Sequence, residues 1–273
     1  MGTIISVDCG RSGVKGVSEH ERLYFRAALG AHRELRNGRE LGIDEFDVLY
    51  KAERYFIGRI AAEESEDGTQ MMTAYKAHTD TKILTLTAIH RLTHPDARVT
   101  LITGLPLKYH IESDKQRMRE LLTGEHELTV NGVKKRFTIE RVEVAAEGAA
   151  AAWHIGRTRR DRFHVVDIGS RTVNYVTMLN GRWIDKDSDS LDYGFETFRG
   201  TEAQFARVLI ADLGRLLRPL GPIVLVGGKE TLAAHLQTYQ DKIEIHPDAL
   251  FANAVAFREM GVTINAKSKA ASR

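Results

Sequence analysis

The sequence predicts an α/β protein made of two duplicated domains, and three observations support this prediction. An apolar strand that ends in Asp-x-Gly occurs twice, as "TIISVDCG" around Asp8 and as "RFHVVDIG" around Asp167. Each copy continues into two more strand-like segments separated by turn residues. Elsewhere, segments of helical period alternate with short β-branched runs, as expected when helices cover a sheet.

The two copies are separated by more than half of the 273 residues, so each can begin its own domain. We predict one domain at 1–145 and a second at 146–273. The polar, broken pattern from about 30–86 predicts a small inserted lobe on the first domain. A last helix at about 247–260 has Pro near its start and Gly at its end, and we expect it to return toward the first domain. Residues 265–273 are expected to be a disordered basic tail.

Local signals specify several boundaries. Asn-Gly pairs at 131–132 and 180–181 lie between strand-like segments, and this pair most readily supplies the two positive φ angles of a tight hairpin. Thr201 and Gln204 have the spacing of a capping box at the start of a long amphipathic helix. These signals place two hairpins and one helix start before any tertiary argument is needed.

Composition excludes several classes of function. The 39 Lys and Arg residues nearly balance the 37 Asp and Glu residues, so we expect no direct binding of nucleic acid. No apolar run approaches the ~20 residues that cross a bilayer, so we expect no membrane association. Cys9 is the only cysteine, which rules out an internal disulfide and fits a reducing compartment. We therefore expect a cytoplasmic protein, and we expect Cys9 to be buried and unreactive.

Each Asp-x-Gly turn has the chemistry of a phosphate site. Gly10 and Gly169 allow backbone N–H groups to face outward, where they suit phosphate oxygens. Asp8 and Asp167, two residues earlier, can hold the waters of a Mg²⁺ ion that neutralises those phosphates. One such turn is commonly only structural. Two in matched three-strand contexts favour a nucleotide or another phosphate ligand.

A third glycine-rich junction, "VLVGGKETL", places Gly227 and Gly228 between a strand and a predicted helix. Close backbone approach and the positive end of a helix would favour the sugar and phosphate part of a nucleotide. A strand-to-helix turn is the competing explanation. The segment is not a Walker A loop, because that pattern would need glycine in place of Ile223 and a hydroxyl residue in place of Glu230.

In order along the chain, the segments "DCGRSGVK", "RYFIGRIA", "ITGLPLKY", "VAAEGAAA", "VVDIGSRTVNY", "VLVGGKETL" and "FANAVAF" resemble the motifs of the actin and sugar-kinase fold. They are most similar to the ParM-type bacterial actin-like ATPases that segregate plasmids, and they span residues 4 to 257. The resemblance implies an actin-like ATPase fold. This fold has two duplicated α/β domains with mixed, five-stranded-type sheets flanked by helices, and a nucleotide cleft between them.

The resemblance also implies catalytic and metal-binding roles. Asp8 and Asp167 would organise a hydrated Mg²⁺. Glu147, at the start of an Ala-rich helix, matches the carboxylate that orients or deprotonates the attacking water in this family. Without the resemblance, Glu147 could simply stabilise a helix N-terminus through the helix dipole.

The implied cofactor is ATP or ADP, and its contacts divide into three groups: the first turn against the β-phosphate, the second turn facing the γ-phosphate, and the Gly-Gly junction beside the adenosine. The implied residues are Gly10, Ser12, Gly13 and Lys15, then Gly169, Ser170, Arg171 and Thr172, and finally Gly227, Gly228 and Lys229. Arg171 departs from the small residue often found there, so either the second turn is shaped differently or the Arg171 guanidinium could reach the nucleotide or a neighbouring subunit. Lys15 could instead be a solvated side chain.

Three functional hypotheses follow. The first is an ATP-hydrolysing protein that polymerises into nucleotide-dependent filaments for plasmid or DNA segregation. Its partners would be further copies of itself and a small DNA-binding adaptor that links the filament to centromere DNA. The second is a sugar-type small-molecule kinase of the same fold, which would need a catalytic Asp directed at a substrate hydroxyl and a sugar pocket, although no candidate motif for these is evident. The third is a nucleotide-dependent binding protein that does not polymerise, in the manner of a chaperone ATPase domain.

Overall fold

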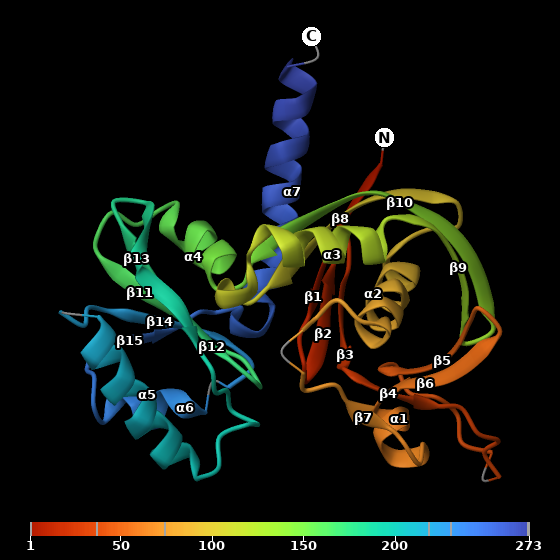
Figure 1. Ribbon diagram of the computed structural model, residues 1–273, viewed down its shortest axis with the longest axis horizontal. Coiled ribbons are helices and arrows are strands. Elements are labelled where there is room, and N and C mark those ends of the chain that lie inside the picture. Colours follow the sequence, from red (N-terminus) through yellow and green to blue (C-terminus); the bar gives the residue numbers. More distant parts are fainter. Residues whose placement is uncertain (1, 37, 74, 218, 230, 272–273) are drawn as a thin grey trace. The chain divides into compact units, whose positions relative to one another are not determined.

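The computed structural model describes residues 2–36, 38–73, 75–217, 219–229 and 231–271 (Figure 1). These residues form two compact units, which we describe one at a time. The first consists of Met1–Gly104, Ile111–Val144 and Phe257–Arg273, and the second of Leu105–His110 and Ala145–Ala256. The main division falls between Val144 and Ala145, beside the boundary predicted after residue 145.

The first unit contains a ten-stranded sheet with the order β3-β2-β1-β8-β10-β9-β5-β6-β4-β7. Strands β1, β2 and β3 form an antiparallel meander, and β8 pairs parallel with β1. The segment predicted as a small lobe supplies β4 to β7, which extend the same sheet. The strands are β1 (Thr3–Cys9), β2 (Gly13–Val17), β3 (Arg22–Arg26), β4 (Ala28–Ala31), β5 (Glu45–Tyr50), β6 (Glu53–Gly58), β7 (Thr69–Gln70), β8 (Ala97–Leu105), β9 (Gly124–Val130) and β10 (Val133–Ala146).

The helices of the first unit cover this sheet locally. Helix α1 (Arg59–Glu64) packs against β4, β5 and β6, and α2 (Thr79–Leu92) packs against β1 and β2. Helix α3 spans Glu112–Leu122. Helix α2 is buried along most of its length because it carries apolar residues and threonines on nearly every face. It therefore supports the two strands that carry the first Asp-x-Gly turn.

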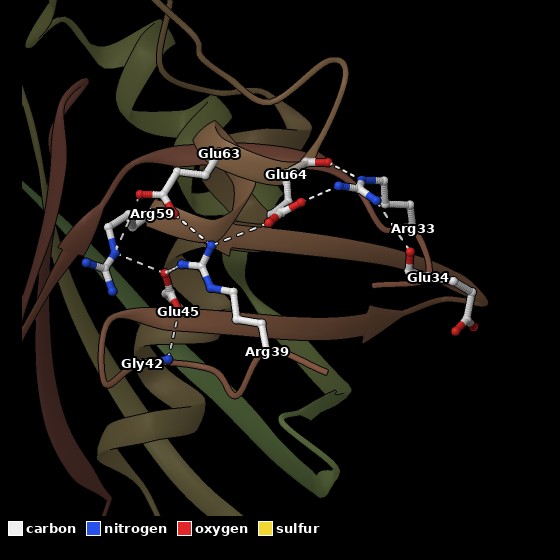
Figure 2. Close-up of polar contacts among 8 residues, drawn as sticks. All are labelled: Arg33, Glu34, Arg39, Gly42, Glu45, Arg59, Glu63 and Glu64. Carbon is white, nitrogen blue, oxygen red and sulfur yellow. Dashed lines mark hydrogen bonds and ion pairs between the residues drawn. The ribbon is translucent and has the colours of Figure 1, made fainter. Parts of the chain in front are cut away.

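A buried carboxylate holds the loop before β5 in place, as Figure 2 shows. Glu45 is fully buried, accepts a 2.7 Å hydrogen bond from the N–H of Gly42, and pairs with Arg39 and Arg59. Burial alone would raise the pKa of Glu45, but the Gly42 N–H and the two guanidinium groups outweigh it, so its pKa lies below the usual value. Arg39 also pairs with Glu63 of α1 at 2.8 Å, which ties the loop to that helix.

The second unit contains a five-stranded sheet with the order β13-β12-β11-β14-β15. Its strands are β11 (Phe163–Ile168), β12 (Val173–Leu179), β13 (Arg182–Leu191), β14 (Ile223–Gly227) and β15 (Ile243–Ile245), and its helices are α4 (Ala149–Gly156), α5 (Glu202–Leu216) and α6 (Leu232–Gln237). Short 3₁₀ turns occur at Leu107–Tyr109 and Ala249–Phe251. Among the described strands, β13 is the outermost on its side, and it carries three aspartates, Asp185, Asp187 and Asp189.

Both faces of the sheet are covered at its central strands β11 and β14. Val166 and Ile168 pack with the apolar face of α5, whereas Phe163 and Val165 pack with α4. Because successive residues of a strand point to opposite faces, Asp167 lies on the same face as Val165, the face that α4 covers. The alternation therefore directs this carboxylate toward the start of α4.

His164 on β11 is buried and neutral. Its Nε2 accepts a 3.1 Å hydrogen bond from the N–H of Gly221, so the proton resides on Nδ1, which donates to Thr177 Oγ1 at 2.8 Å. Burial lowers the pKa of His164 to about 4. A proton on Nε2 would face the Gly221 N–H, so the charged form is disfavoured by both burial and geometry.

The two sheets repeat one topology. In each, an antiparallel meander of three strands is followed later in the chain by a strand that pairs parallel with its first member: β8 with β1, and β14 with β11. This confirms the prediction of two sheets flanked by helices, although the first sheet is twice as wide as the five-stranded type expected. The additional width comes from β9 and from the 28–70 segment that supplies β4 to β7.

The structure confirms the turn and helix-cap predictions but not the prediction for the C-terminal tail. Both Asn-Gly turns have positive φ at each residue, and the Thr201–Gln204 capping box is present. The prediction of a disordered tail from residue 265 was wrong as far as Ala271, because helix α7 (Ala252–Ala271) continues through it, while 272–273 lie outside the described residues. Alanine and lysine are strong helix formers, which explains the continuation. No helix in the described parts of the chain is long and apolar enough to cross a membrane.

Candidate functional site

The first Asp-x-Gly turn joins β1 to β2. Asp8 and Lys15 are cross-strand partners, and Lys15 Nζ lies 3.4 Å from Asp8 Oδ2. A Cβ on Gly10 would lie 2.8 Å from the carbonyl oxygen of Gly13 and 3.0 Å from Lys15 Nζ. The turn is therefore too tight for any residue but glycine at position 10, and the lysine ammonium group lies against it.

Residues outside the predicted set also hold this turn. The carbonyl oxygen of Ser12 accepts a hydrogen bond from Gln70 Nε2 at 3.3 Å. Arg11 donates to the carbonyl oxygen of Tyr75 at 2.6 Å and to His78 Nε2 at 3.0 Å. Burial, followed by the nearby Arg11 charge, lowers the pKa of His78, which favours the neutral ring that can accept from Arg11. No local pattern in the sequence indicates these contacts, because they join residues 58 to 67 positions apart.

The second Asp-x-Gly turn, between β11 and β12, has the same shape. A Cβ on Gly169 would lie 2.9 Å from the carbonyl oxygen of Thr172, and the Gly169 N–H donates to that oxygen at 3.0 Å. The backbone N–H groups of Phe195 and Glu196 donate to the carbonyl oxygens of Gly169 and Ser170. The neighbouring segment thus binds the carbonyl edge of this turn and fixes its conformation.

Arg171 lies within this second turn. Its carbonyl oxygen accepts a hydrogen bond from Thr197 Oγ1 at 3.4 Å. None of the described residues forms a hydrogen bond or ion pair with its guanidinium group. Within the described part of the chain, no polar contact holds the Arg171 side chain in place. The hypothesis that its guanidinium reaches a nucleotide or a neighbouring subunit is compatible with this.

Two buried asparagines bind Asp167. Asn174 Nδ2 and Asn253 Nδ2 donate to Asp167 Oδ2 at 3.2 Å and 2.9 Å. The other oxygen, Oδ1, lies on the side of Gly227, where a Cβ would approach it to 3.1 Å. Asn174 and Asn253 were not among the predicted site residues, although both lie within motifs that carry the family resemblance.

Glu147 lies in the turn between β10 and α4. It is buried, and its N–H donates to the carbonyl oxygen of Leu105 at 2.8 Å. The Ala-rich pattern predicted a helix that begins near Glu147, and helix α4 begins two residues later, at Ala149. Glu147 therefore lies in the turn before the helix and not in its first turn. Gly148 between them has a φ of 74°, and its N–H donates to Asn253 Oδ1 at 2.9 Å.

These contacts close into a hydrogen-bonded ring within the second unit. From Asp167 the ring passes through Asn253 to Gly148, and through Glu147 to Leu105. The chain continues from Leu105 to Leu107, whose N–H donates to Asn174 Oδ1 at 3.1 Å, and Asn174 returns to Asp167. Ser190 Oγ donates to the same asparagine oxygen at 2.7 Å. The structure therefore brings the turn of Glu147 and the carboxylate of Asp167 into one network.

The Gly-Gly junction follows β14. A Cβ on Gly227 would lie 2.5 Å from the carbonyl oxygen of Ile168, so this glycine packs directly on the strand that carries Asp167. Lys229 Nζ lies 3.8 Å from the centroid of the Phe195 ring, a cation–π contact. The expected helix-end contribution is not supported here, because α6 begins only at Leu232 and is six residues long.

Each of the two aspartates, taken within its own unit, has the chemistry of a ligand for a hydrated cation. Within the described residues, no three His, Cys, Asp or Glu side chains gather as metal ligands would. Asp8 and Asp167 each end an apolar strand beside a glycine turn, and both are buried. Mg²⁺ commonly keeps several waters and takes only one or two carboxylates together with phosphate oxygens, so a single carboxylate beside a phosphate-binding turn fits it.

Two sheets of the same topology, each flanked by helices and each with an Asp-x-Gly turn after its first strand, define an actin-like fold. The family model for the N-terminal domain of actin-like proteins matches residues 6–149, more than half of the chain. The chain belongs to this family of actin-like proteins. No curated protein sequence matches it.

Solved structures agree with this assignment. The apo ParM protein of psk41 has 16% identity and a TM-score of 0.77, over 98% of this chain and 99% of that chain. A 15-stranded ParM filament from Clostridium botulinum has 17% identity and a TM-score of 0.80, over 96% and 99%. An AlfA filament bound to AMPPNP has 22% identity and a TM-score of 0.71, over 95% and 99%. At these identities, the similarity establishes the fold.

Proposed function

We propose that this protein binds ATP and ADP with Mg²⁺, hydrolyses ATP and assembles into nucleotide-dependent filaments. The observation that carries the proposal is the pair of Asp-x-Gly turns. In each unit, the turn follows the first strand of the meander, and a Cβ added to its glycine would lie at nearly the same distance from the carbonyl oxygen three residues later, 2.8 Å and 2.9 Å. So tight a turn follows a buried aspartate in both units, and binding of phosphate by each turn would account for this repetition.

In this proposal, each turn binds phosphate through its backbone N–H groups. Gly10, Ser12 and Gly13 contact the β-phosphate. Lys15 adds a positive charge beside them, and its contact with Asp8 positions the ammonium group over the turn. Gly169 to Thr172 bind the γ-phosphate in the same way. Phosphoryl transfer depends chiefly on positioning and on neutralisation of charge, and both turns serve these ends.

Asp8 and Asp167 would hold a hydrated Mg²⁺ through its waters. Such an ion would supply positive charge that offsets the phosphate charge repelling an attacking oxygen. Glu147 acts as the general base that orients the attacking water and takes its proton. Its burial and the hydrogen bonds on both sides of its turn suit a group that must keep one position during catalysis. The adenosine would be contacted by Gly227, Gly228 and Lys229.

The filament part of the proposal is supported by the neighbours, which include ParM and AlfA filaments and an archaeal actin homolog in complex with ADP. We propose that copies of this chain stack head to tail in the cytoplasm and that hydrolysis weakens their contacts. A role in plasmid or DNA segregation would add a small DNA-binding adaptor as a partner. The nearly balanced charge of the chain supports contact with DNA through that adaptor rather than directly.

Sedimentation and light scattering of the purified protein with ATP, with ADP and without nucleotide test this proposal, together with phosphate release in Mg²⁺ and in EDTA. We expect pelleting with ATP and Mg²⁺-dependent phosphate release. A soluble protein that hydrolyses ATP only when a sugar is added would establish the kinase instead. A soluble protein that binds ATP and neither sediments nor turns over would establish the non-polymerising binding protein.

A further inference from the structure

We propose that Asn174 and Asn253 are positioning residues, which hold the Asp167 carboxylate and the Glu147 turn in one fixed arrangement. This inference rests on the proposed function, because it assigns these asparagines to the Mg²⁺-nucleotide site. It arises from the hydrogen-bonded ring of the second unit. Both asparagines are buried, and both use each end of the side-chain amide within that ring.

The chemistry of the amide explains why asparagine occupies both positions. Each must donate to Asp167 Oδ2 and also accept from a backbone N–H, of Gly148 for Asn253 and of Leu107 for Asn174. A side-chain amide carries a donor and an acceptor on the same carbon and can do both. An ionised aspartate would face Asp167 with a second negative charge, and an apolar residue would leave the N–H and the carboxylate oxygen without these partners.

The same contacts hold one oxygen of Asp167. Oδ2 receives two hydrogen bonds from side-chain amides, so this oxygen has a fixed position within the second unit. Removing a partner that orients a metal-side ligand typically weakens metal affinity about 10- to 100-fold.

The ring also fixes the turn that carries Glu147. Its two consecutive backbone N–H groups are both bound, that of Glu147 by Leu105 and that of Gly148 by Asn253. Leu107, two residues after Leu105, is bound in turn by Asn174. A shift of the turn relative to Asp167 must therefore break at least one of these bonds. The proposed base and the proposed metal-side carboxylate keep their spacing because the asparagines join them.

The test measures binding of a fluorescent ADP to the full chain, with Mg²⁺ and with EDTA. We expect Asn253→Ala to weaken Mg²⁺-ADP binding about tenfold or more, the usual effect of removing a partner that orients a metal-side ligand. Binding in EDTA should stay unchanged, since the turns themselves remain. The matched control is Asn265→Ala, which replaces an asparagine on the same helix α7 that makes none of these contacts and should bind as the parent chain does.

A double-mutant cycle decides whether Asn253 acts through Asp167. Asp167→Ala should weaken Mg²⁺-ADP binding, and adding Asn253→Ala should weaken it no further, because the side chain it orients is already gone. Circular dichroism checks that each variant is folded, and Asn253→Ser serves as a second variant if the alanine form does not fold. If the two changes multiply, or if Asn253→Ala loses binding equally in EDTA, Asn253 is only structural and the inference is overturned.

The same measurements distinguish failure of the proposed function from failure of the positioning role. A parent chain that binds ADP neither with Mg²⁺ nor with EDTA would overturn the proposed function, whatever the variants do. A parent chain that binds Mg²⁺-ADP, with Asn253→Ala equal to Asn265→Ala, would overturn the positioning role and leave the proposed function standing.

Discussion

Replacing Gly148 by alanine tests the ring at its tightest point. Gly148 has a φ of 74° and a ψ of −47°, and L-residues avoid the left-handed side of φ by about 1–2 kcal/mol. A Cβ there would also lie 2.9 Å from Cβ of Asn174, and overpacking of this kind costs about 1–3 kcal/mol. We therefore expect Gly148→Ala to lower the free energy of unfolding by about 2–5 kcal/mol.

The chain supplies a matched control. Gly132, in the turn between β9 and β10, has a φ of 76°, and a Cβ there would meet nothing within 4 Å. Gly132→Ala should lose only the conformational part, about 1–2 kcal/mol. Urea unfolding followed by circular dichroism measures the free energy of unfolding of both variants. The two values are compared only if the variants have the same dependence of this free energy on urea concentration. Equal losses would refute the claim that position 148 packs against Asn174. Of the two variants, only Gly148→Ala should lower the affinity for Mg²⁺-ADP. The added Cβ at position 148 would displace Asn174, which binds Asp167, whereas the change at position 132 touches neither residue.

Three further predictions concern charge and protonation. Lys15→Ala should weaken ADP binding about tenfold at low salt and less at high salt, because Lys15 Nζ lies over the turn of Asp8; a salt-independent effect in titration calorimetry would contradict this. Glu147→Gln should still sediment with ATP but release phosphate more slowly, and unchanged release would remove Glu147 from the mechanism. Lowering the pH from 7.5 to 5 should reduce the free energy of unfolding by about 2 kcal/mol for each of His90 and His164. Burial lowers the pKa of each histidine to about 4 in the folded protein. As the pH falls, these histidines are therefore protonated in the unfolded chain before they are protonated in the folded one. This stability is fully present above the ordinary pKa of 6.5, is lost below it and levels off below pH 4; urea midpoints that do not change with pH would contradict the prediction.

The parts of the fold that are determined by residues close together in the sequence could be predicted from it. An apolar run that stops at Asp8 or Asp167 and is followed by a glycine specifies a strand and a turn within ten residues. The repetition of this pattern then specifies two sheets of one topology, which the structure contains. The Asn-Gly turns and the cap at Thr201 are equally local, and each has the expected geometry.

The asparagine ring could not be predicted in this way. Asn253 reaches Gly148 across 105 positions and Asp167 across 86, and no periodicity reports such distances. The available signal was an asparagine within an otherwise apolar or small-residue run, "TVNYV" for Asn174 and "FANAVAF" for Asn253. A polar side chain in such a run is buried only if it has partners, so both asparagines could have been chosen as candidates, though not paired with Asp167.

Charged residues left the sequence interpretation incomplete elsewhere. The segment around Arg39, Glu45 and Arg59 is polar, and its broken pattern favoured a small inserted lobe on the first domain. In the structure, Glu45 is buried and pairs with the two guanidinium groups, and the strands of this segment extend the sheet of the first unit. Whether a charge is solvated or paired depends on residues distant in sequence, so composition alone does not decide it.

The aspartates of β13 bear on how copies of this protein can associate. An outermost strand offers unpaired backbone groups to another chain, and a second copy could add its own β13 to extend the sheet. Pairing of two such strands about a twofold axis would bring Asp185, Asp187 and Asp189 of both copies together, and their like charges would oppose it. Extension of the second sheet by pairing of β13 with its own copy is thereby disfavoured, so the edge of this sheet at β13 is protected by its charges against association of this kind.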